Sequence, residues 1–370
     1  MAQRQTSSLA RRLGEISGEH ALDKQVSNMV VDISEREKTD GAPNEATLNS
    51  IVQQIHTVGY AVVSRVVSED TCVLLADSIH EDVIRIREAG KPTLHEQYTG
   101  QGHLQLGLRR YAPYVRSDLI ANPIIESIVA TVLGSSAWLG FYNGNVNCPG
   151  STSQPLHMDR PFAWKSPEEA AQAGQSWPPP TTTLSCSVAL DEISLDNGAT
   201  EIYPGTHHAT EVIELLQGSR LEAHPALLEK WGPPQRMLIP AGGVVFRDPR
   251  MWHRGVPNPS ANPRAMLALT YHSRLAKHWR GLLMSDMDPI DLKKCEQKSH
   301  LRVLDNGELG DGRLVFQEDT RDVLDASRNL HGIDRNIRFV DQPLRINHFL
   351  DAQFVGGARV VSEDTLTVVE

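Results

Sequence analysis

The chain has 370 residues, of which 40% are hydrophobic, and this length allows one or two domains with a large buried core. Its 36 basic and 46 acidic residues give a net charge of −10, which disfavours nucleic acid and anionic membranes as partners. No stretch is long and apolar enough to cross a bilayer, so we expect a soluble protein without a membrane partner.

The N-terminal part of the chain predicts a flexible arm followed by a helix, a strand and a second helix. Residues 1–44 are polar and end in a turn-like sequence, so we expect them to form the arm. Apolar residues over 48–55 follow helical spacing, and the β-branched run 60–67 predicts a strand. Residues 69–89 repeat apolar positions at the spacing of an amphipathic helix.

From about Trp138 the sequence consists of short β-rich runs that Pro, Gly, Asn and Asp separate, which is typical of an antiparallel sandwich or barrel. The runs are 137–142, 184–190, 200–203, 237–239, 244–247 and 265–273. A long insertion, 161–183, interrupts them, and a loop of that length in a compact domain usually forms a lid or a binding loop. After about residue 275 the pattern becomes irregular and predicts no secure element.

The pattern His-x-Asp or His-x-Glu occurs twice, about as often as chance predicts for 15 histidines and 46 acids. His80 and Asp82 fall in the second predicted helix, where residues two apart point in nearly opposite directions, so they cannot share a metal ion. We expect both on a solvated helix face. His157 and Asp159 lie in extended-looking sequence, where residues two apart point to the same side and can converge on one ion.

A third metal ligand is expected in segment 248–258, which follows a predicted strand and contains His253. Two histidines and one carboxylate on one face of an octahedron leave three open positions, which suits non-haem Fe(II) enzymes that activate dioxygen. Arg264 opens the run 264–272, whose alternation predicts one face toward a polar cavity and the other against helices. A guanidinium on the inner face favours a carboxylate partner, because it can donate two parallel hydrogen bonds.

Five motifs occur in a characteristic order along the chain. They are His157-x-Asp159, the segment 188–207 with Asn197-Gly198 and Pro204-Gly205-Thr206-His207, the loop Trp252-His253-Arg254-Gly255, His253 itself, and Arg264 eleven residues later. Over about residues 48–275 this set resembles the phytanoyl-CoA dioxygenase family of Fe(II)/2-oxoglutarate-dependent oxygenases. Thr206 stands where the family usually has serine. Asn197-Gly198 and Pro204-Gly205 are also turn dipeptides, which makes them markers of the fold.

The resemblance implies a mainly β fold with flanking helices (α+β) around a double-stranded β-helix, the jelly roll of cupin-like proteins. We expect residues 1–44 to be the flexible arm and residues 45–275 to be the oxygenase domain. We expect residues 276–370 to be a C-terminal extension packed on the same domain.

The resemblance also implies cofactors and the residues that bind them. Fe(II) is expected on His157, Asp159 and His253. The cosubstrate 2-oxoglutarate is expected on the metal through its keto oxygen and C1 carboxylate, and on Arg264 through its far carboxylate. Further expected contacts of the cosubstrate are Gln154, Thr183 and Ser185. Expected substrate contacts are Arg109, Phe162, Trp164 and Trp252.

The implied reaction is the oxidation by O2 of an unactivated C–H bond in a small organic substrate of secondary metabolism, with release of succinate and CO2. Hydroxylation, desaturation and ring closure all stay open, and ascorbate is the expected reductant in vitro. One competing interpretation is a cupin-type metal oxygenase or isomerase without a cosubstrate, in which Arg264 binds the substrate. Another is a catalytically silent jelly-roll binding protein, and a zinc hydrolase is less favoured.

The four cysteines are scattered along the chain and form no CxxC pair, so we expect free thiols and a cytoplasmic location. The arginines of the N-terminal arm leave a targeting segment open. A homodimer also stays open.

Overall fold

The structure, a computed structural model, describes residues 30–88, 96, 100–106, 108, 113–114, 116–216 and 220–275, and the backbone of four short strands farther along. The helices are α2 (Glu35–Asp40), α3 (Glu45–Val58), α4 (Glu69–Glu88), α6 (Ser117–Ile120), α7 (Pro123–Leu133), α8 (Pro167–Gln172), α9 (Val212–Leu215) and α10 (Pro225–Lys230). The four short strands pair as β11 (Arg313–Phe316) with β12 (Ile337–Val340) and β13 (Ala358–Ser362) with β14 (Thr365–Val368). The predicted packing of residues 276–370 lies outside the described residues.

A seven-stranded sheet forms the centre of the described part of the chain, in the order β1-β2-β8-β5-β10-β4-β3. Its strands are β1 (Val30–Asp32), β2 (Tyr60–Ser64), β3 (His103–Leu106), β4 (Trp138–Asn147), β5 (Thr183–Ala189), β8 (Val244–Arg247) and β10 (Arg264–His272). All neighbours run antiparallel except β1 and β2, which are parallel.

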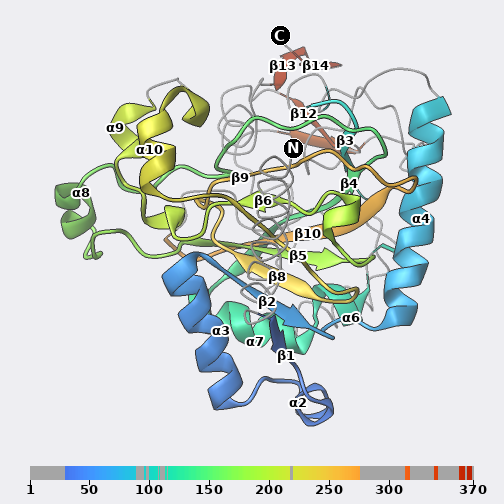
Figure 1. Ribbon diagram of the computed structural model, residues 1–370, viewed down its shortest axis with the longest axis horizontal. Coiled ribbons are helices and arrows are strands. Elements are labelled where there is room, and N and C mark those ends of the chain that lie inside the picture. The colour runs from blue at the N-terminus through green and yellow to red at the C-terminus, as the bar shows by residue number, and fades with distance from the viewer. Residues whose placement is uncertain are drawn as a thin grey trace, which may run out of the picture.

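A second, three-stranded sheet has the order β7-β6-β9, from β7 (Gln235–Arg236), β6 (Glu201–Ile202) and β9 (His253–Arg254). An antiparallel bridge between His157 and His253 extends this sheet by one position. Figure 1 shows β6 and β9 on one side of β5, β8 and β10. From β4 to β10 the chain passes back and forth between the two sheets, which is the path of a double-stranded β-helix. The predicted jelly-roll core is confirmed.

Strand β10 separates the core from a cavity by simple alternation. Ala265, Leu267, Leu269 and Tyr271 are buried in the large core cluster, whereas Arg264, Met266, Ala268 and Thr270 line the cavity. Successive side chains of a strand point to opposite faces, so one strand serves both surfaces. The predicted alternation of residues 264–272 is therefore confirmed.

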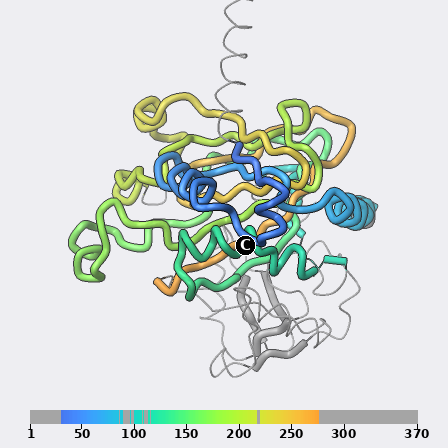
Figure 2. Tube along the Cα trace, turned by 90° about the horizontal axis from the view of Figure 1, so that it is seen from below, coloured from blue at the N-terminus to red at the C-terminus, as the bar shows by residue number. Residues whose placement is uncertain are grey.

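Helices cover the outer face of the large sheet. Helix α7 begins with Pro123 at its first position, and the Asn122 side chain accepts hydrogen bonds from the backbone N–H groups of Ile124 and Ile125. Its apolar residues pack against β5, β10 and α3. Figure 2, seen from this side, shows α3 in blue and α7 in teal in front of the strands. Helix α4 runs along one side of the molecule (Figure 1).

The N-terminal boundary differs from the prediction, because residues 30–44 belong to the fold. Strand β1 pairs with β2, and Ser34 and Glu37 form a capping box at the start of α2. The Glu37 carboxylate also accepts hydrogen bonds from the backbone N–H and the side chain of Asn44, which caps α3. The flexible arm predicted for 1–44 is wrong for these fifteen residues, since a three-residue edge strand gives no periodic signal.

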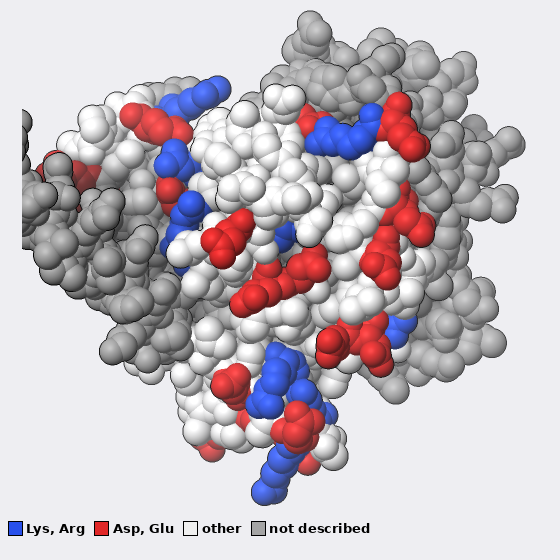
Figure 3. All heavy atoms as spheres, turned by 45° about the vertical axis from the view of Figure 1, so that its right-hand side comes forward, with Lys and Arg blue, Asp and Glu red and all other residues white. Residues whose placement is uncertain are grey.

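Side-chain burial corrects one further expectation. Asp82 of α4 is buried rather than solvated, and it accepts a hydrogen bond of 2.5 Å from the Tyr114 hydroxyl. Cys72, Cys148 and Cys186 are free and buried, as predicted, and Cys295 lies outside the described residues. None of the helices described here is long and apolar enough to cross a membrane. On the face shown in Figure 3, lysines and arginines stand in small groups beside acidic side chains.

Candidate metal centre

Three side chains from two neighbouring segments meet at one point. His157 Nε2 lies 3.6 Å from Asp159 Oδ1, and His253 Nε2 lies 3.4 Å from Asp159 Oδ2. The two imidazole rings are 4.4 Å apart between centroids. All three potential ligand atoms lie within 4.8 Å of one another, close enough for one metal ion. The bridge between His157 and His253 holds the two segments in this register.

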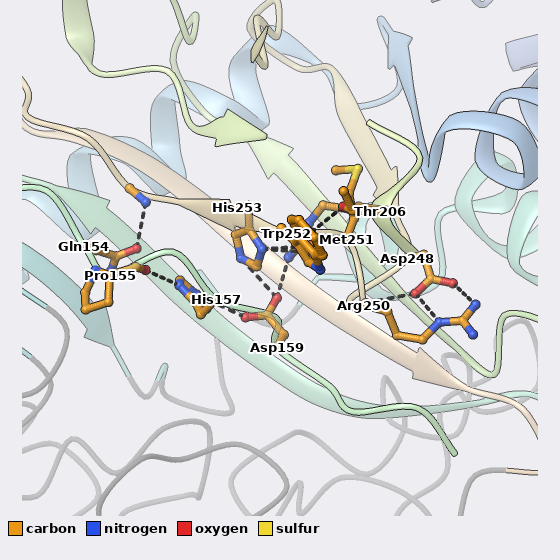
Figure 4. A network of polar contacts seen from close by, with 12 residues as sticks. Gln154, Pro155, His157, Asp159, Thr206, Asp248, Arg250, Met251, Trp252 and His253 are labelled. Carbon is orange, nitrogen blue, oxygen red and sulfur yellow. Dashed lines mark hydrogen bonds and ion pairs between the residues drawn. The ribbon is translucent and has the colours of Figure 1, made fainter. Parts of the chain in front are cut away.

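The backbone sets the orientation of both histidine rings. His157 Nδ1 lies 2.8 Å from the carbonyl oxygen of Pro155, and His253 Nδ1 lies 3.0 Å from that of Met251. An Nδ1–H that donates to a carbonyl leaves the Nε2 lone pair for a cation. Both Nε2 atoms face Asp159, as Figure 4 shows. The two carbonyl groups thus orient both rings with Nε2 toward Asp159.

Burial and neighbouring charges keep His157 and Asp159 in their metal-binding forms. Burial lowers the pKa of His157 to about 4, and the neighbouring His253 and Arg247 add to this effect. Burial alone raises the pKa of Asp159, but His253 and Arg247 outweigh it and hold that pKa well below its usual range. Neutral imidazoles and an ionised carboxylate are the forms that bind divalent metals.

Arg247, which the sequence did not single out, makes direct contact with this group. It ends β8, and its Nη2 donates a short hydrogen bond to Asp159 Oδ2. Its Nη1 lies 3.2 Å from His253 Nδ1. The sequence carried no signal for this residue, because its position depends on the pairing of β8 with β2 and β5.

The three side chains open into a cavity of about 210 Å³. Its wall is mixed, with amides, hydroxyls, methionines and three guanidinium groups. The charged and titratable residues that line it are His103, His157, Asp159, Arg160, Arg247, His253 and Arg264. Sequence reasoning did not identify His103, Arg160 or Arg247. A cavity of this size suits a small molecule whose polar groups meet a few fixed partners.

Arg264 is buried in the cavity wall, and its guanidinium can donate further hydrogen bonds. Its Nη2 donates to the carbonyl oxygen of Gly198 over 2.9 Å, while its Nε has no hydrogen-bond partner among the residues that the structure describes. Burial lowers the pKa of Arg264 to about 10, although Asp191 opposes the shift. A buried guanidinium N–H without a partner is costly, so the site fits an anionic group that would accept from it.

Gly198 has a specific reason to be glycine. Its φ is +80°, and a Cβ would lie 2.6 Å from Asn147 Nδ2 and 2.9 Å from the carbonyl oxygen of Pro257. The left-handed backbone and the crowding together exclude a side chain. The turn predicted at Asn197-Gly198 thereby presents the carbonyl that holds Arg264.

Of the other three expected cosubstrate contacts, Gln154 and Ser185 line the cavity and Thr183 does not. Gln154 lines the cavity, but its Oε1 already accepts a hydrogen bond of 2.8 Å from the backbone N–H of Gly255. Ser185 lines the cavity with Ser187. Thr183 is not among the residues that line the cavity, and its hydroxyl is 3.1 Å from His272 Nδ1. Their contact with a cosubstrate stays a prediction.

The aromatic residues expected to contact substrate lie off the cavity wall. Trp252 is fully buried in a cluster that also contains Phe162 and Tyr203. Trp164 is buried as well, and it is not among the lining residues. Arg109 lies outside the described residues. A substrate role for these four residues therefore stays a prediction. The geometry does not favour it for Phe162, Trp164 and Trp252.

The long insertion 161–183 is tied down at both stems. Arg250 Nη1 donates to the carbonyl oxygen of Pro179 over 2.9 Å, and the Thr181 hydroxyl donates to Asp248 over 2.7 Å. Arg250 also lies over the ring of Phe162, 5.2 Å from its centroid. Asp248 and Arg250 are themselves joined by a buried ion pair of 2.6 Å (Figure 4). Both stems are thus attached to the β8–β9 loop that leads to His253.

Comparison with known proteins adds independent information. The sequence profile described as phytanoyl-CoA dioxygenase matches residues 55–266. The dioxygenase andF of Emericella variicolor is 22% identical over 248 residues, which cover 62% of this chain and 75% of that protein. The dioxygenase trt7 of Aspergillus terreus is 24% identical, with 59% of this chain and 71% of that protein covered. The crystal structure of AviO1 from Streptomyces viridochromogenes Tue57 is 19% identical, with a TM-score of 0.45 and coverage of 62% and 96%.

Proposed function

The chain belongs to the phytanoyl-CoA dioxygenase family, and on this basis we propose that it is an Fe(II)/2-oxoglutarate-dependent dioxygenase acting on a small organic substrate. One observation carries the proposal. A two-histidine, one-carboxylate group opens into the same cavity as a buried arginine whose Nε has no hydrogen-bond partner in the described part of the chain. The first group suits Fe(II), and the second suits the far carboxylate of a keto diacid.

The proposed division of labour follows from these contacts. His157, Asp159 and His253 would hold Fe(II), and Arg264 would hold the far carboxylate of 2-oxoglutarate. When bound, the metal would activate O2, which would oxidise both 2-oxoglutarate, to succinate and CO2, and an unactivated C–H bond of the substrate. The carbonyl groups of Pro155 and Met251 keep the two imidazoles oriented throughout.

The size and lining of the cavity support a small substrate with both polar and apolar parts. We assign the reaction to secondary metabolism, with hydroxylation, desaturation and ring closure as the outcomes that substrate position decides. The carboxylate at position 159 argues against a halogenase, because that chemistry needs the position for a halide. A cytoplasmic location and the absence of nucleic acid and membrane partners stay predictions from composition.

The decisive experiment measures succinate. Purified protein with Fe(II), 2-oxoglutarate, ascorbate and air is screened against small organic acids, amino acids and other metabolites, and succinate release is expected to depend on both added cofactors. In Asp159→Ala and His253→Ala, this release is expected to fall to background, because each change removes a ligand. His80→Ala alters the other His-x-Asp motif, on α4, and should retain full turnover.

The same protein gives a second, anaerobic readout. Addition of 2-oxoglutarate to the Fe(II)-loaded protein is expected to produce a weak visible charge-transfer band. Wild-type protein that shows neither this band nor succinate formation would exclude the proposed function. Turnover without 2-oxoglutarate would instead favour a cosubstrate-independent metal oxygenase.

A further inference from the structure

Arg247 stands behind the proposed metal site, on the inner face of the large sheet. Its neighbours across the sheet are Tyr60 on β2 and Ser185 on β5, so its backbone is fixed from both sides. Only 8% of its side chain is exposed, whereas 41% of the Asp159 side chain is open to the cavity. A nearly buried guanidinium in the cavity wall therefore holds a carboxylate that is itself still partly exposed.

The contact is selective for one of the two carboxylate oxygens. Arg247 Nη2 donates to Asp159 Oδ2, which also lies 3.4 Å from His253 Nε2, while Oδ1 lies 3.6 Å from His157 Nε2 and receives no hydrogen bond from Arg247. The backbone N–H of Asp159 also donates to the carbonyl oxygen of Pro249 over 2.9 Å, which fixes the residue relative to the β8–β9 loop. Asp159 is thus held at its backbone and at one oxygen of its side chain.

This selectivity matters for the number of free positions on a bound metal. Two imidazoles and one carboxylate oxygen occupy three of six octahedral positions and leave three open. A cosubstrate that chelates through two oxygens and a molecule of O2 need all three. A carboxylate that binds through both oxygens would leave only two, which is one too few.

From this arrangement we propose that Arg247 is a positioning residue that restricts Asp159 to a single oxygen for the metal, and so keeps a coordination position free for the cosubstrate. The inference rests on the proposed function. In this proposal Arg247 acts through Asp159, although its Nη1 also lies 3.2 Å from His253 Nδ1. Its contact with Oδ2 occupies the oxygen that a two-oxygen binding mode would require.

The test separates metal binding from cosubstrate binding. Co²⁺ affinity is measured by quenching of tryptophan fluorescence, and 2-oxoglutarate affinity by the anaerobic visible band of the Fe(II)-loaded protein. In Arg247→Met we expect Co²⁺ affinity within about tenfold of wild type and 2-oxoglutarate affinity weakened by at least about tenfold. Arg247→Lys keeps a charged N–H donor, and its 2-oxoglutarate affinity is expected within about threefold of wild type.

A matched control removes a neighbouring arginine that points elsewhere. Arg254 lies on β9 beside His253 and pairs with Glu201 over 2.7 Å. Arg254→Met should leave both affinities within about twofold of wild type, because a partly exposed ion pair contributes little. A loss in this variant equal to that in Arg247→Met would show a general effect of charge and overturn the proposal.

Two results for Arg247→Met contradict the inference directly. Unchanged 2-oxoglutarate affinity means that Arg247 does not control the free position. Loss of Co²⁺ binding together with 2-oxoglutarate binding, in a folded variant, means that it assembles the site instead. Where Arg247→Met does not fold, a crystal structure of the wild-type protein with Co²⁺ decides, and Asp159 bound through both oxygens would overturn the proposal.

The outcomes also distinguish this inference from the proposed function. Wild-type protein that binds no 2-oxoglutarate refutes the function itself. Wild-type protein that binds it, together with an Arg247→Met variant that binds it equally well, refutes only the role of Arg247.

Discussion

Both metal-site histidines use the same local device, in which the ring nitrogen remote from the site meets the carbonyl two residues earlier in the chain. Pro155 serves His157, and Met251 serves His253. The device needs only extended backbone, so it could recur on two segments far apart in sequence. At Arg264 the supporting carbonyl comes instead from the Gly198 turn, which is far away along the chain. A substitution at Gly198 is therefore expected to disturb Arg264 as well.

At the scale of residues, the role of Arg264 leads to a prediction about kinetics. Arg264→Met is expected to raise the KM for 2-oxoglutarate by about 10- to 100-fold, because a buried charge-assisted contact is lost. Arg264→Lys should recover only part of it, since an ammonium does not match a carboxylate with two parallel bonds. Steady-state succinate release at varied 2-oxoglutarate concentrations measures the effect. An unchanged KM in Arg264→Met would remove this residue from the cosubstrate site.

Elements of this fold are joined by single buried polar residues. Glu37 connects the N-terminus of α2 to that of α3, with hydrogen bonds of 2.6 to 2.9 Å from Ser34 and Asn44. Arg250 connects the two stems of the insertion to the loop before β9. Each joint leads to a prediction about stability.

The Glu37 joint should depend on pH. Hydrogen bonding, led by Ser34, lowers the pKa of Glu37 from 4.5 to about 2. Because the folded-state pKa is lowered, the stabilisation is complete above about pH 4.5 and is lost as the pH falls toward 2. Glu37→Gln is expected to lower the free energy of unfolding by about 2 kcal/mol at pH 7. Urea unfolding should show this difference shrinking between pH 5 and about pH 2, and a difference that stays constant would contradict the assignment.

The Arg250 joint should matter more for stability. Arg250→Met leaves Asp248 buried without its cation, and the free energy of unfolding is expected to fall by about 3 to 5 kcal/mol. Limited proteolysis should then cut within residues 161–183 before it cuts elsewhere in the described part of the chain. The exposed pair of Lys230 with Glu211 provides the control, because Lys230→Met should cost less than about 1 kcal/mol. Equal losses of unfolding free energy in Arg250→Met and Lys230→Met would contradict a special role of Arg250 in holding the insertion.

At the scale of the molecule, sequence predicted what depends on local patterns. The alternation along residues 264–272 gave the inner and outer faces of β10, and ordered motifs gave His157, Asp159, His253 and Arg264. Arg247 and Arg250 could not be found in this way. Their contacts depend on sheet register and on the path of a loop, which no spacing in the sequence encodes. Strand β1 was not predicted for a related reason, since three residues at a sheet edge are too few to show a periodic hydrophobic pattern.

Metal binding should be coupled to the stability of the whole described domain. The three candidate ligands come from two segments that are nearly a hundred residues apart and meet only in the folded chain. Co²⁺ at 100 times its Kd is therefore expected to add about 2.7 kcal/mol to the free energy of unfolding. Thermal melts with Co²⁺ and with EDTA measure the difference. Asp159→Ala should show no such gain, and a gain equal to that of wild type would place the metal elsewhere.

The attachment of the insertion at both stems has a consequence for protein engineering. No residue of 161–182 lines the cavity, and the stems converge on Arg250 and Asp248. We therefore expect that the part of the insertion between its two stems can be replaced by another sequence. Grafts that preserve Phe162, Pro179 and Thr181 are expected to leave the cavity wall intact.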